Sequence, residues 1–335
     1  MSNDADGAEG LRLWPMALND AREIPTITLS GLRSGRRADL ERIGNEIGQA
    51  ARGLGFFSVA GHGIDPAQID AVFARSRAFF TLPQSEKDHL SVANSTSYRG
   101  YVKLGEEKLD TALAGDVKEC FNVGPDLAAD DPRVLAGEPY HAVNQWPALP
   151  GFRAPILAFA AAALELVVLL QRAIAVDLGL DERFFDEHFS AAVGVLRLLH
   201  YPPHPGTFDG SLYGAGAHTD YGNLTLLAQD ETGGLEVRRR DGTWVPVAPQ
   251  PGTFVCNIGD CLMRWTNDIY VSNAHRVVNR SGRERYSIAY FFDPNPEARV
   301  EAIPSCVAAG AAPLYPPVLA ADYLKMRLDA SVPAM

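Results

Sequence analysis

Two histidines and one aspartate are spaced so that they can bind a single metal ion. His218 and Asp220 are separated by one residue in the segment AHTDYG, and His275 follows in SNAHRVVN. On a strand, residues i and i+2 point to the same face, so His218 and Asp220 can reach one ion, with His275 as a third ligand. Two histidines and one carboxylate leave three coordination positions open, which is typical of non-haem iron(II) oxygenases. A zinc hydrolase, which fills three of four tetrahedral positions, remains an alternative from these residues alone.

An arginine and a serine downstream can bind a carboxylate. Arg285 and Ser287 lie on the same face of a predicted strand, together with Phe291. An arginine that faces the interior of a β-structure is costly unless it meets an anion, and its guanidinium forms a bidentate pair with a carboxylate. A buried pair with an aspartate or glutamate of the chain is the alternative. Phe291 lies further along this face, roughly 13 Å beyond the serine at about 3.3 Å per residue, and is a candidate substrate contact.

The elements that position these residues form a helical N-terminal half and a C-terminal β-region. Apolar spacing predicts helices over residues 38–51, 66–80 and 150–179, a shorter helix near 181–189, and strands at 24–29 and 56–59. Residues 91–125 are rich in glycine and serine, which predicts an irregular segment. From residue 193, short strands alternate with turn signals such as Gly233-Gly234 and Asp241-Gly242. Strands are predicted at 195–200, 224–229, 235–238, 244–247, 253–258, 275–278 and 286–292. Many short strands indicate a closed or double-sheet β-structure such as a jelly roll.

Composition excludes several classes of partner. The chain has 335 residues with 47% hydrophobic and 21% charged residues, and its formal net charge is −11. An acidic protein is a poor ligand for nucleic acid or an anionic membrane, which both need a positive field. The most apolar stretch, residues 155–179, contains three charged residues and is predicted to be a buried helix. Four cysteines without a CxxC pair, and an acidic N-terminus unlike a signal peptide, predict a cytoplasmic protein.

Longer segments resemble a known family. The segments AHTDYGNLTLLAQDETGGLEV, WVPVAPQPGTFVCNIGDCLMRWTND and SNAHRVVNRSGRERYSIAYFFDPNP are similar to the isopenicillin-N-synthase-like group of 2-oxoglutarate/Fe(II)-dependent dioxygenases. In the N-terminal half, IPTITLSGL, GFFSVAGHGI and FFTLPQSEK resemble the same family in the same order. The similarity covers about residues 24–300. It implies a single oxygenase domain over residues 1–335, with an N-terminal dioxygenase region at 24–130 and a catalytic core at 193–300.

The resemblance also implies a fold and roles for individual residues. The fold is mainly β with flanking helices, a double-stranded β-helix (jelly-roll) core joined to a helical N-terminal half. His218, Asp220 and His275 would bind Fe(II), and Arg285, Ser287 and Tyr201 would bind 2-oxoglutarate. Leu199 stands where many relatives have an asparagine, which puts one co-substrate contact in doubt. Tyr98, Arg99 and Tyr101 lie in YRGYVKLG, which resembles the loop that lines the entrance in relatives. They are candidate substrate contacts, with exposure on the surface as the alternative.

The expected reaction consumes 2-oxoglutarate and O2, yields succinate and CO2, and oxidises a small-molecule substrate, with hydroxylation as the default outcome. Desaturation, ring formation and epoxidation use the same residues. An iron oxidase of this family that forms rings without 2-oxoglutarate, binding its substrate at Arg285 and Ser287, is a second hypothesis. A zinc hydrolase or metal-binding jelly-roll protein is a third.

Overall fold

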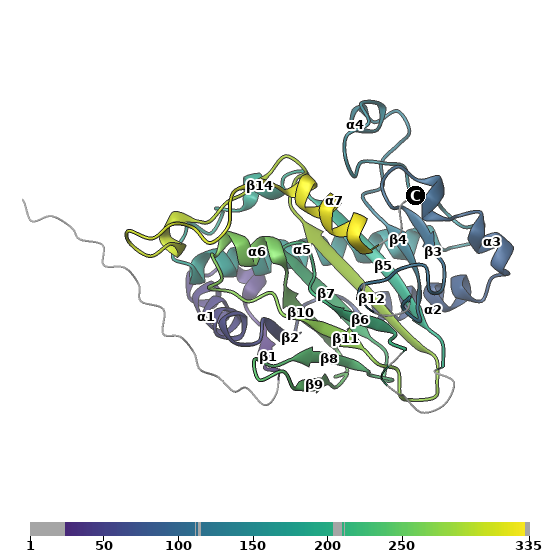
Figure 1. The fold of residues 1–335 in the computed structure, drawn as a ribbon, viewed down its shortest axis with the longest axis horizontal. Coiled ribbons are helices and arrows are strands. Elements are labelled where there is room, and N and C mark those ends of the chain that lie inside the picture. The colour runs from purple at the N-terminus through teal and green to yellow at the C-terminus, as the bar shows by residue number, and fades with distance from the viewer. Residues whose placement is uncertain (1–23, 111, 113–114, 204–209, 211, 332–335) are drawn as a thin grey trace, which may run out of the picture.

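Two β-sheets form the centre of the molecule, and helices cover the outside of the larger one (Figure 1). The computed structural model describes residues 24–110, 112, 115–203, 210 and 212–331. The larger sheet has eight strands in the order β1-β2-β10-β7-β12-β5-β4-β3. Their bounds are β1 Thr26–Thr28, β2 Phe56–Ala60, β3 Gly100–Val102, β4 Glu119–Val123, β5 Val193–Tyr201, β7 Leu224–Gln229, β10 Thr253–Ile258 and β12 Arg285–Asp293.

The smaller sheet has four strands in the order β6-β11-β8-β9. Their bounds are β6 Ala215–His218, β8 Leu235–Arg238, β9 Trp244–Val247 and β11 His275–Val277. A hydrophobic cluster that draws on both sheets fills the space between them, with Leu199 and Ala289 from the larger sheet and Val237 and Val277 from the smaller. The two sheets are antiparallel apart from the parallel pair β1 and β2, and together with their shared core they form the expected jelly roll.

Helices pack on the opposite face of the larger sheet. The long helix α5 (Arg153–Asp177) lies against α1 (Arg37–Gly53) and α2 (Pro66–Phe80), and their buried side chains join the main hydrophobic core. By length and composition α5 is the one helix among the described residues that could cross a membrane. Its face with Leu166, Leu170 and Ile174 is fully buried in that core, as predicted for a core helix.

The remaining elements are short or lie near the C-terminus. They are the helices α3 (Gln84–Asp88), α4 (Pro132–Leu135), α6 (Asp260–Trp265) and α7 (Ala320–Ser331), the strands β13 (Arg299–Val300) and β14 (Val318–Leu319), and 3-10 turns at Leu32–Ser34, Val92–Asn94, Asp186–Phe189 and Pro304–Cys306. Neither α6 nor α7 was predicted.

The prediction that residues 91–125 are irregular is wrong in part, because β3 and β4 extend the larger sheet there. Every residue of β4 is buried, including the polar Glu119 and Asn122. Glu119 pairs with Lys87 and Asn122 accepts a hydrogen bond from Arg197, so these partners from elsewhere in the chain allow polar residues inside. A strand with polar residues among its buried positions has no alternating pattern that would reveal it in the sequence.

Candidate active site

The three predicted metal ligands meet where two neighbouring strands of the smaller sheet end and begin. β6 ends at His218, β11 begins at His275, and these two histidines are antiparallel register partners. Asp220 lies beyond the end of β6, so the expectation that a single strand presents both His218 and Asp220 is wrong in detail. The backbone carbonyl of Asp220 accepts a hydrogen bond from the Asp260 amide at 2.8 Å, which fixes the turn and returns the carboxylate toward the histidines.

The potential ligand atoms of His218, Asp220 and His275 all lie within 4.8 Å of one another. Asp220 Oδ1 is 3.9 Å from His218 Nε2 and 3.6 Å from His275 Nε2. All three side chains are largely removed from solvent. This donor set of two imidazole nitrogens and one carboxylate oxygen fits a divalent metal with open coordination positions.

Hydrogen bonds leave one atom of each ligand free for a metal. His218 Nδ1 donates to the Gly216 carbonyl at 2.7 Å, and His275 Nδ1 lies 3.3 Å from the Asn273 carbonyl. With Nδ1 turned to a backbone carbonyl, Nε2 is the ring nitrogen that each histidine presents to the cluster. Asp220 Oδ2 accepts from Thr225 Oγ1 and Asn257 Nδ2, both at 2.6 Å, which leaves Oδ1 for the metal.

Protonation states also favour metal binding. Burial, reinforced by the neighbouring His275, lowers the pKa of His218 well below its ordinary value, so this imidazole is neutral near pH 7. Burial opposes ionisation of Asp220, but His275, His218 and the bonds from Asn257 and Thr225 outweigh it, and the pKa of Asp220 is lowered. Neutral histidine and ionised aspartate are the forms that coordinate a divalent cation.

Arg285 is fully buried at the start of β12, and the side chains predicted to share its function surround it. Its Nη1 donates to Ser287 Oγ at 3.1 Å, its Nη2 donates to Gln229 Oε1 at 3.1 Å, and its Nε donates to the Gly233 carbonyl. Its guanidinium carbon lies 4.5 Å from the centre of the Tyr201 ring. Among the described residues no carboxylate pairs with Arg285, so the alternative of an internal arginine–acid pair finds no partner there.

The pairing of β12 with β5 sets the spacing between this arginine and Phe291. Arg285 lies opposite Tyr201, Ser287 opposite Leu199, and Phe291 opposite Val195. Alternate residues of β12 divide between the two hydrophobic clusters, with Ala289 and Phe291 on the inner side and Tyr286, Ile288, Tyr290 and Phe292 on the outer. The predicted register of this strand is confirmed.

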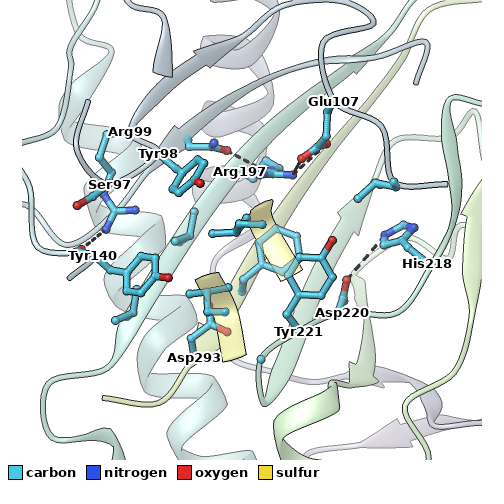
Figure 2. A pocket seen from close by; sticks show the side chains of 18 residues that line it. Ser97, Tyr98, Arg99, Glu107, Tyr140, Arg197, His218, Asp220, Tyr221 and Asp293 are labelled. Atoms are coloured by element: carbon cyan, nitrogen blue, oxygen red, sulfur yellow. Dashed lines mark hydrogen bonds and ion pairs between the residues drawn. The ribbon is translucent and has the colours of Figure 1, made fainter. Parts of the chain in front are cut away.

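A cavity opens beside the candidate metal ligands (Figure 2). His218 and Asp220 form one side of it, and Phe291, Tyr98 and Arg99 line it further away. Arg285, Ser287, Tyr201 and His275 are not among its lining residues. Tyr101 does not line it either: its ring packs against Phe79, and its hydroxyl donates to Glu119 at 2.5 Å on the other side of β3. Strand alternation would put residues 99 and 101 on one face, but Arg99 lies before β3 begins and Gly100 between them has a φ of 112°, so the two side chains are not related by the strand period.

Other cavity residues were missed from the sequence. Arg197 lies on the inner face of β5, donates to Glu107 at 3.1 Å and to Asn122 at 2.8 Å, and its guanidinium lies 5.5 Å from the Phe291 ring. Asp293 follows Phe291 by one further alternation of β12. Both could have been found by extending the same period-two pattern along β5 and β12. The cavity also receives Leu324 and Leu328 from α7, for which the sequence gives no signal.

Comparison with known proteins gives the same assignment for both halves of the chain. Residues 24–149 match the family described as "non-haem dioxygenase in morphine synthesis N-terminal", and residues 192–294 match the "2OG-Fe(II) oxygenase superfamily". The 2-oxoglutarate-Fe(II) type oxidoreductase hxnY of Emericella nidulans is 39% identical over 277 residues, which cover 81% of this chain and 79% of that protein.

Solved structures agree in fold. A Neurospora crassa protein crystallised with alpha-KG (2-oxoglutarate) and thymine superimposes with a TM-score of 0.81 at 34% identity, covering 94% of this chain and 99% of that one. A rice dioxygenase for auxin oxidation superimposes with a TM-score of 0.72 at 28% identity, covering 92% and 95%. The chain therefore belongs to the 2OG-Fe(II) oxygenase superfamily and is a 2-oxoglutarate-dependent non-haem iron dioxygenase.

Proposed function

We propose that the enzyme oxidises a small organic molecule held in the cavity beside His218 and Asp220, with His218, Asp220 and His275 as the Fe(II) ligands. The observation that carries this proposal is the convergence of three ligand atoms within 4.8 Å, each left free by the hydrogen bonds of its own side chain. When bound, Fe(II) together with 2-oxoglutarate and O2 supplies the oxidant, and 2-oxoglutarate leaves as succinate and CO2.

Arg285, Ser287 and Tyr201 anchor the far carboxylate of 2-oxoglutarate in this proposal. An arginine has five N–H donors, and three of those on Arg285 are used by Gly233, Ser287 and Gln229. One N–H on each terminal nitrogen remains for a carboxylate. Because Ser287 Oγ accepts from Arg285, its own proton is free to be donated to the same carboxylate.

Phe291, Tyr98 and Arg99 are proposed to contact the organic substrate, since all three line the cavity with two of the metal ligands. Tyr98 has a left-handed backbone with a φ of 55°, a conformation that costs a non-glycine residue about 1–3 kcal/mol and is typical of functional segments. Thymine in the Neurospora complex and auxin in the name of the rice enzyme support a small-molecule substrate. Hydroxylation is the proposed outcome.

The test is turnover of 2-oxoglutarate by the Fe(II)-loaded protein under O2. Succinate should form even without the organic substrate, at a slow uncoupled rate, and His218→Ala should abolish it. Absence of succinate with intact iron binding would instead favour the ring-forming oxidases, which the comparisons do not support. Hydrolytic turnover with zinc would instead favour a zinc hydrolase.

We also propose a cytoplasmic location, which is supported by the four cysteines, all of them buried and unpaired.

A further inference from the structure

The side of the cavity away from His218 carries two ionisable side chains of opposite charge type that do not form an ion pair with each other. Arg99 and Asp293 lie there, separated from His218 by Tyr221, as Figure 2 shows. Arg99 precedes β3, and Asp293 is the last residue of β12, so the cavity brings together segments far apart in the sequence. Among the described residues no ion pair joins the two.

Arg99 is a buried cation with unused donors. Its side chain belongs to a residue that is 2% exposed, and its Nη2 donates to the Tyr140 carbonyl at 2.8 Å. Its Nε is buried without a partner, and no carboxylate of the described residues lies within ion-pair distance. Burial lowers the pKa of Arg99 to about 10, which still leaves it charged at neutral pH. A buried, unpaired guanidinium is strongly unfavourable unless an anion completes its surroundings.

Asp293, like Arg99, is a buried ionisable group without an ion-pair partner among the described residues. It is nearly inaccessible to solvent, and among the described residues no side chain or amide donates a hydrogen bond to its carboxylate. Burial, with the nearby charge of Asp220, raises the pKa of Asp293 to about 7. A carboxyl group held in this way accepts a hydrogen bond from any donor that enters the cavity.

Two glycines make the space that these charged groups occupy. A Cβ atom at Gly124 would lie 2.1 Å from the guanidinium carbon of Arg99, and one at Gly222 would lie 2.0 Å from Asp293 Oδ1. Neither glycine has a positive φ, so backbone conformation does not require glycine at these positions. The absence of a side chain at both positions lets Arg99 and Asp293 sit where they line the cavity.

The other cations around the site already have partners. Arg197 is paired with Glu107, and Arg285 lies outside this cavity, where the proposed function gives it the carboxylate of 2-oxoglutarate. Arg99 is therefore the cavity cation left for the organic substrate.

We propose that the organic substrate carries a carboxylate that binds Arg99 and, close to it, an ammonium or hydroxyl group that donates to Asp293, as in an amino acid or hydroxy acid. This inference rests on the proposed function, since it names the substrate class of the same site. A carboxylate matches the guanidinium in charge and geometry. A neighbouring donor matches Asp293, and the remainder of the molecule then extends toward His218 and Asp220, where oxidation occurs.

Equilibrium binding to the Fe(II)- and 2-oxoglutarate-loaded protein without O2 tests the inference without depending on turnover. The probes are three matched series, based on phenylalanine, leucine and arginine. Each series contains the L-amino acid, its primary amide, and the same acid without the amino group. Calorimetry should show that in at least one series the amino acid binds most tightly and the amide most weakly.

Variants assign the preference to its residues. Arg99→Gln should weaken the amino acid and the deaminated acid by about 30-fold or more and leave the amide unchanged, because only the acids use the guanidinium. Gly124→Ala should weaken the same two probes by displacing the guanidinium while keeping its charge. Asp293→Asn should weaken the amino acid by about 10-fold and the deaminated acid much less. Arg172→Gln, which removes an arginine paired with Asp186 outside the cavity, is the matched control and should change nothing.

The inference is overturned if the wild-type protein prefers the acids over the amides in none of the three series, or if the preference survives Arg99→Gln. Binding of 2-oxoglutarate, measured in the same protein, separates this failure from that of the proposed function. Normal 2-oxoglutarate binding without an acid preference rejects only the substrate class. Loss of 2-oxoglutarate binding in the wild-type protein rejects the proposed function itself.

Discussion

Replacement of Arg285 by glutamine should weaken 2-oxoglutarate binding strongly while leaving the fold intact. The side chain is fully buried, and one N–H on each terminal nitrogen remains for the co-substrate. Loss of these two charge-assisted hydrogen bonds should raise the free energy of the complex by about 2–4 kcal/mol. That corresponds to a roughly 30- to 700-fold higher dissociation constant. Ser287→Ala removes one hydroxyl donor and should cost about 1 kcal/mol, or roughly 5-fold.

Calorimetric titration of 2-oxoglutarate into the Mn(II)-loaded protein measures this without oxidation, and the KM for 2-oxoglutarate in succinate formation should rise in parallel. Arg283→Gln is a matched control from the same part of the chain. The Arg283 side chain is 60% exposed and pairs with the exposed Glu231 at 3.1 Å, so its loss should change the affinity very little. Thermal unfolding checks that each variant is folded, and Arg285→Lys keeps the charge if the glutamine variant is unstable.

An Arg285→Gln protein that is folded and binds 2-oxoglutarate within about threefold of the wild-type affinity would refute the carboxylate anchor. A variant that keeps its dependence on 2-oxoglutarate but loses affinity for the organic substrate would place that substrate at Arg285 instead.

Three further predictions concern the metal, the substrate and pH. His218→Ala or His275→Ala should abolish Fe(II) binding, measured by calorimetry, because two remaining ligands compete poorly with water; retained binding would contradict the triad. Phe291→Ala should weaken the organic substrate by about 1–3 kcal/mol and raise the ratio of succinate to product, with the KM for 2-oxoglutarate nearly unchanged; lost 2-oxoglutarate binding would contradict this. In the metal-free protein, the folded-state pKa of Asp293 near 7 exceeds the ordinary 3.8, so the folded state binds the extra proton. The contribution of Asp293 to the free energy of unfolding should therefore fall as pH rises from about 4 to about 7, whereas the lowered pKa of His218 acts in the opposite direction. The free energy of unfolding of the wild type minus that of Asp293→Asn, measured with denaturant in chelator, isolates the Asp293 contribution and should fall over that range.

The clustering of His218, Asp220 and His275 and the face of β12 could be predicted because their patterns are strict. A strand has a period of two, so the positions of Arg285, Ser287 and Phe291 on one face follow from the sequence alone. The same period of two puts Asp293 on this face of β12, and it puts Arg197 on the corresponding face of the neighbouring strand β5. The helix Pro66–Phe80 and the strands β7 to β10 begin and end where the sequence predicts, since glycine, proline and aspartate mark their ends.

The position of Arg99 could not be predicted in the same way. Its guanidinium is held by the Tyr140 carbonyl and fits against Gly124, and both partners lie in segments without regular spacing. Tyr140 itself has a φ of 63°, which no pattern of apolar residues predicts. The contacts of α7 with the site were missed for a related reason. Besides Leu324 and Leu328 in the cavity, α7 contributes Arg327, which donates to Thr219 at 3.1 Å, and a charged helical residue ordinarily faces solvent.

This difference follows from what each part of the site must do. The proposed metal ligands and carboxylate anchor lie on or directly beside β6, β11 and β12, where hydrogen-bonded register fixes the spacing of the side chains. Oxidation requires that spacing whatever the substrate is, and the sheet supplies it. The far side of the cavity, where the substrate is proposed to bind, is formed instead by the segment before β3, the segment around Tyr140 and α7. Changes in those segments can alter the shape and charge of the cavity without moving a sheet hydrogen bond. The core can therefore keep one chemistry while the residues proposed to contact the substrate, Arg99 among them, change which molecule is oxidised.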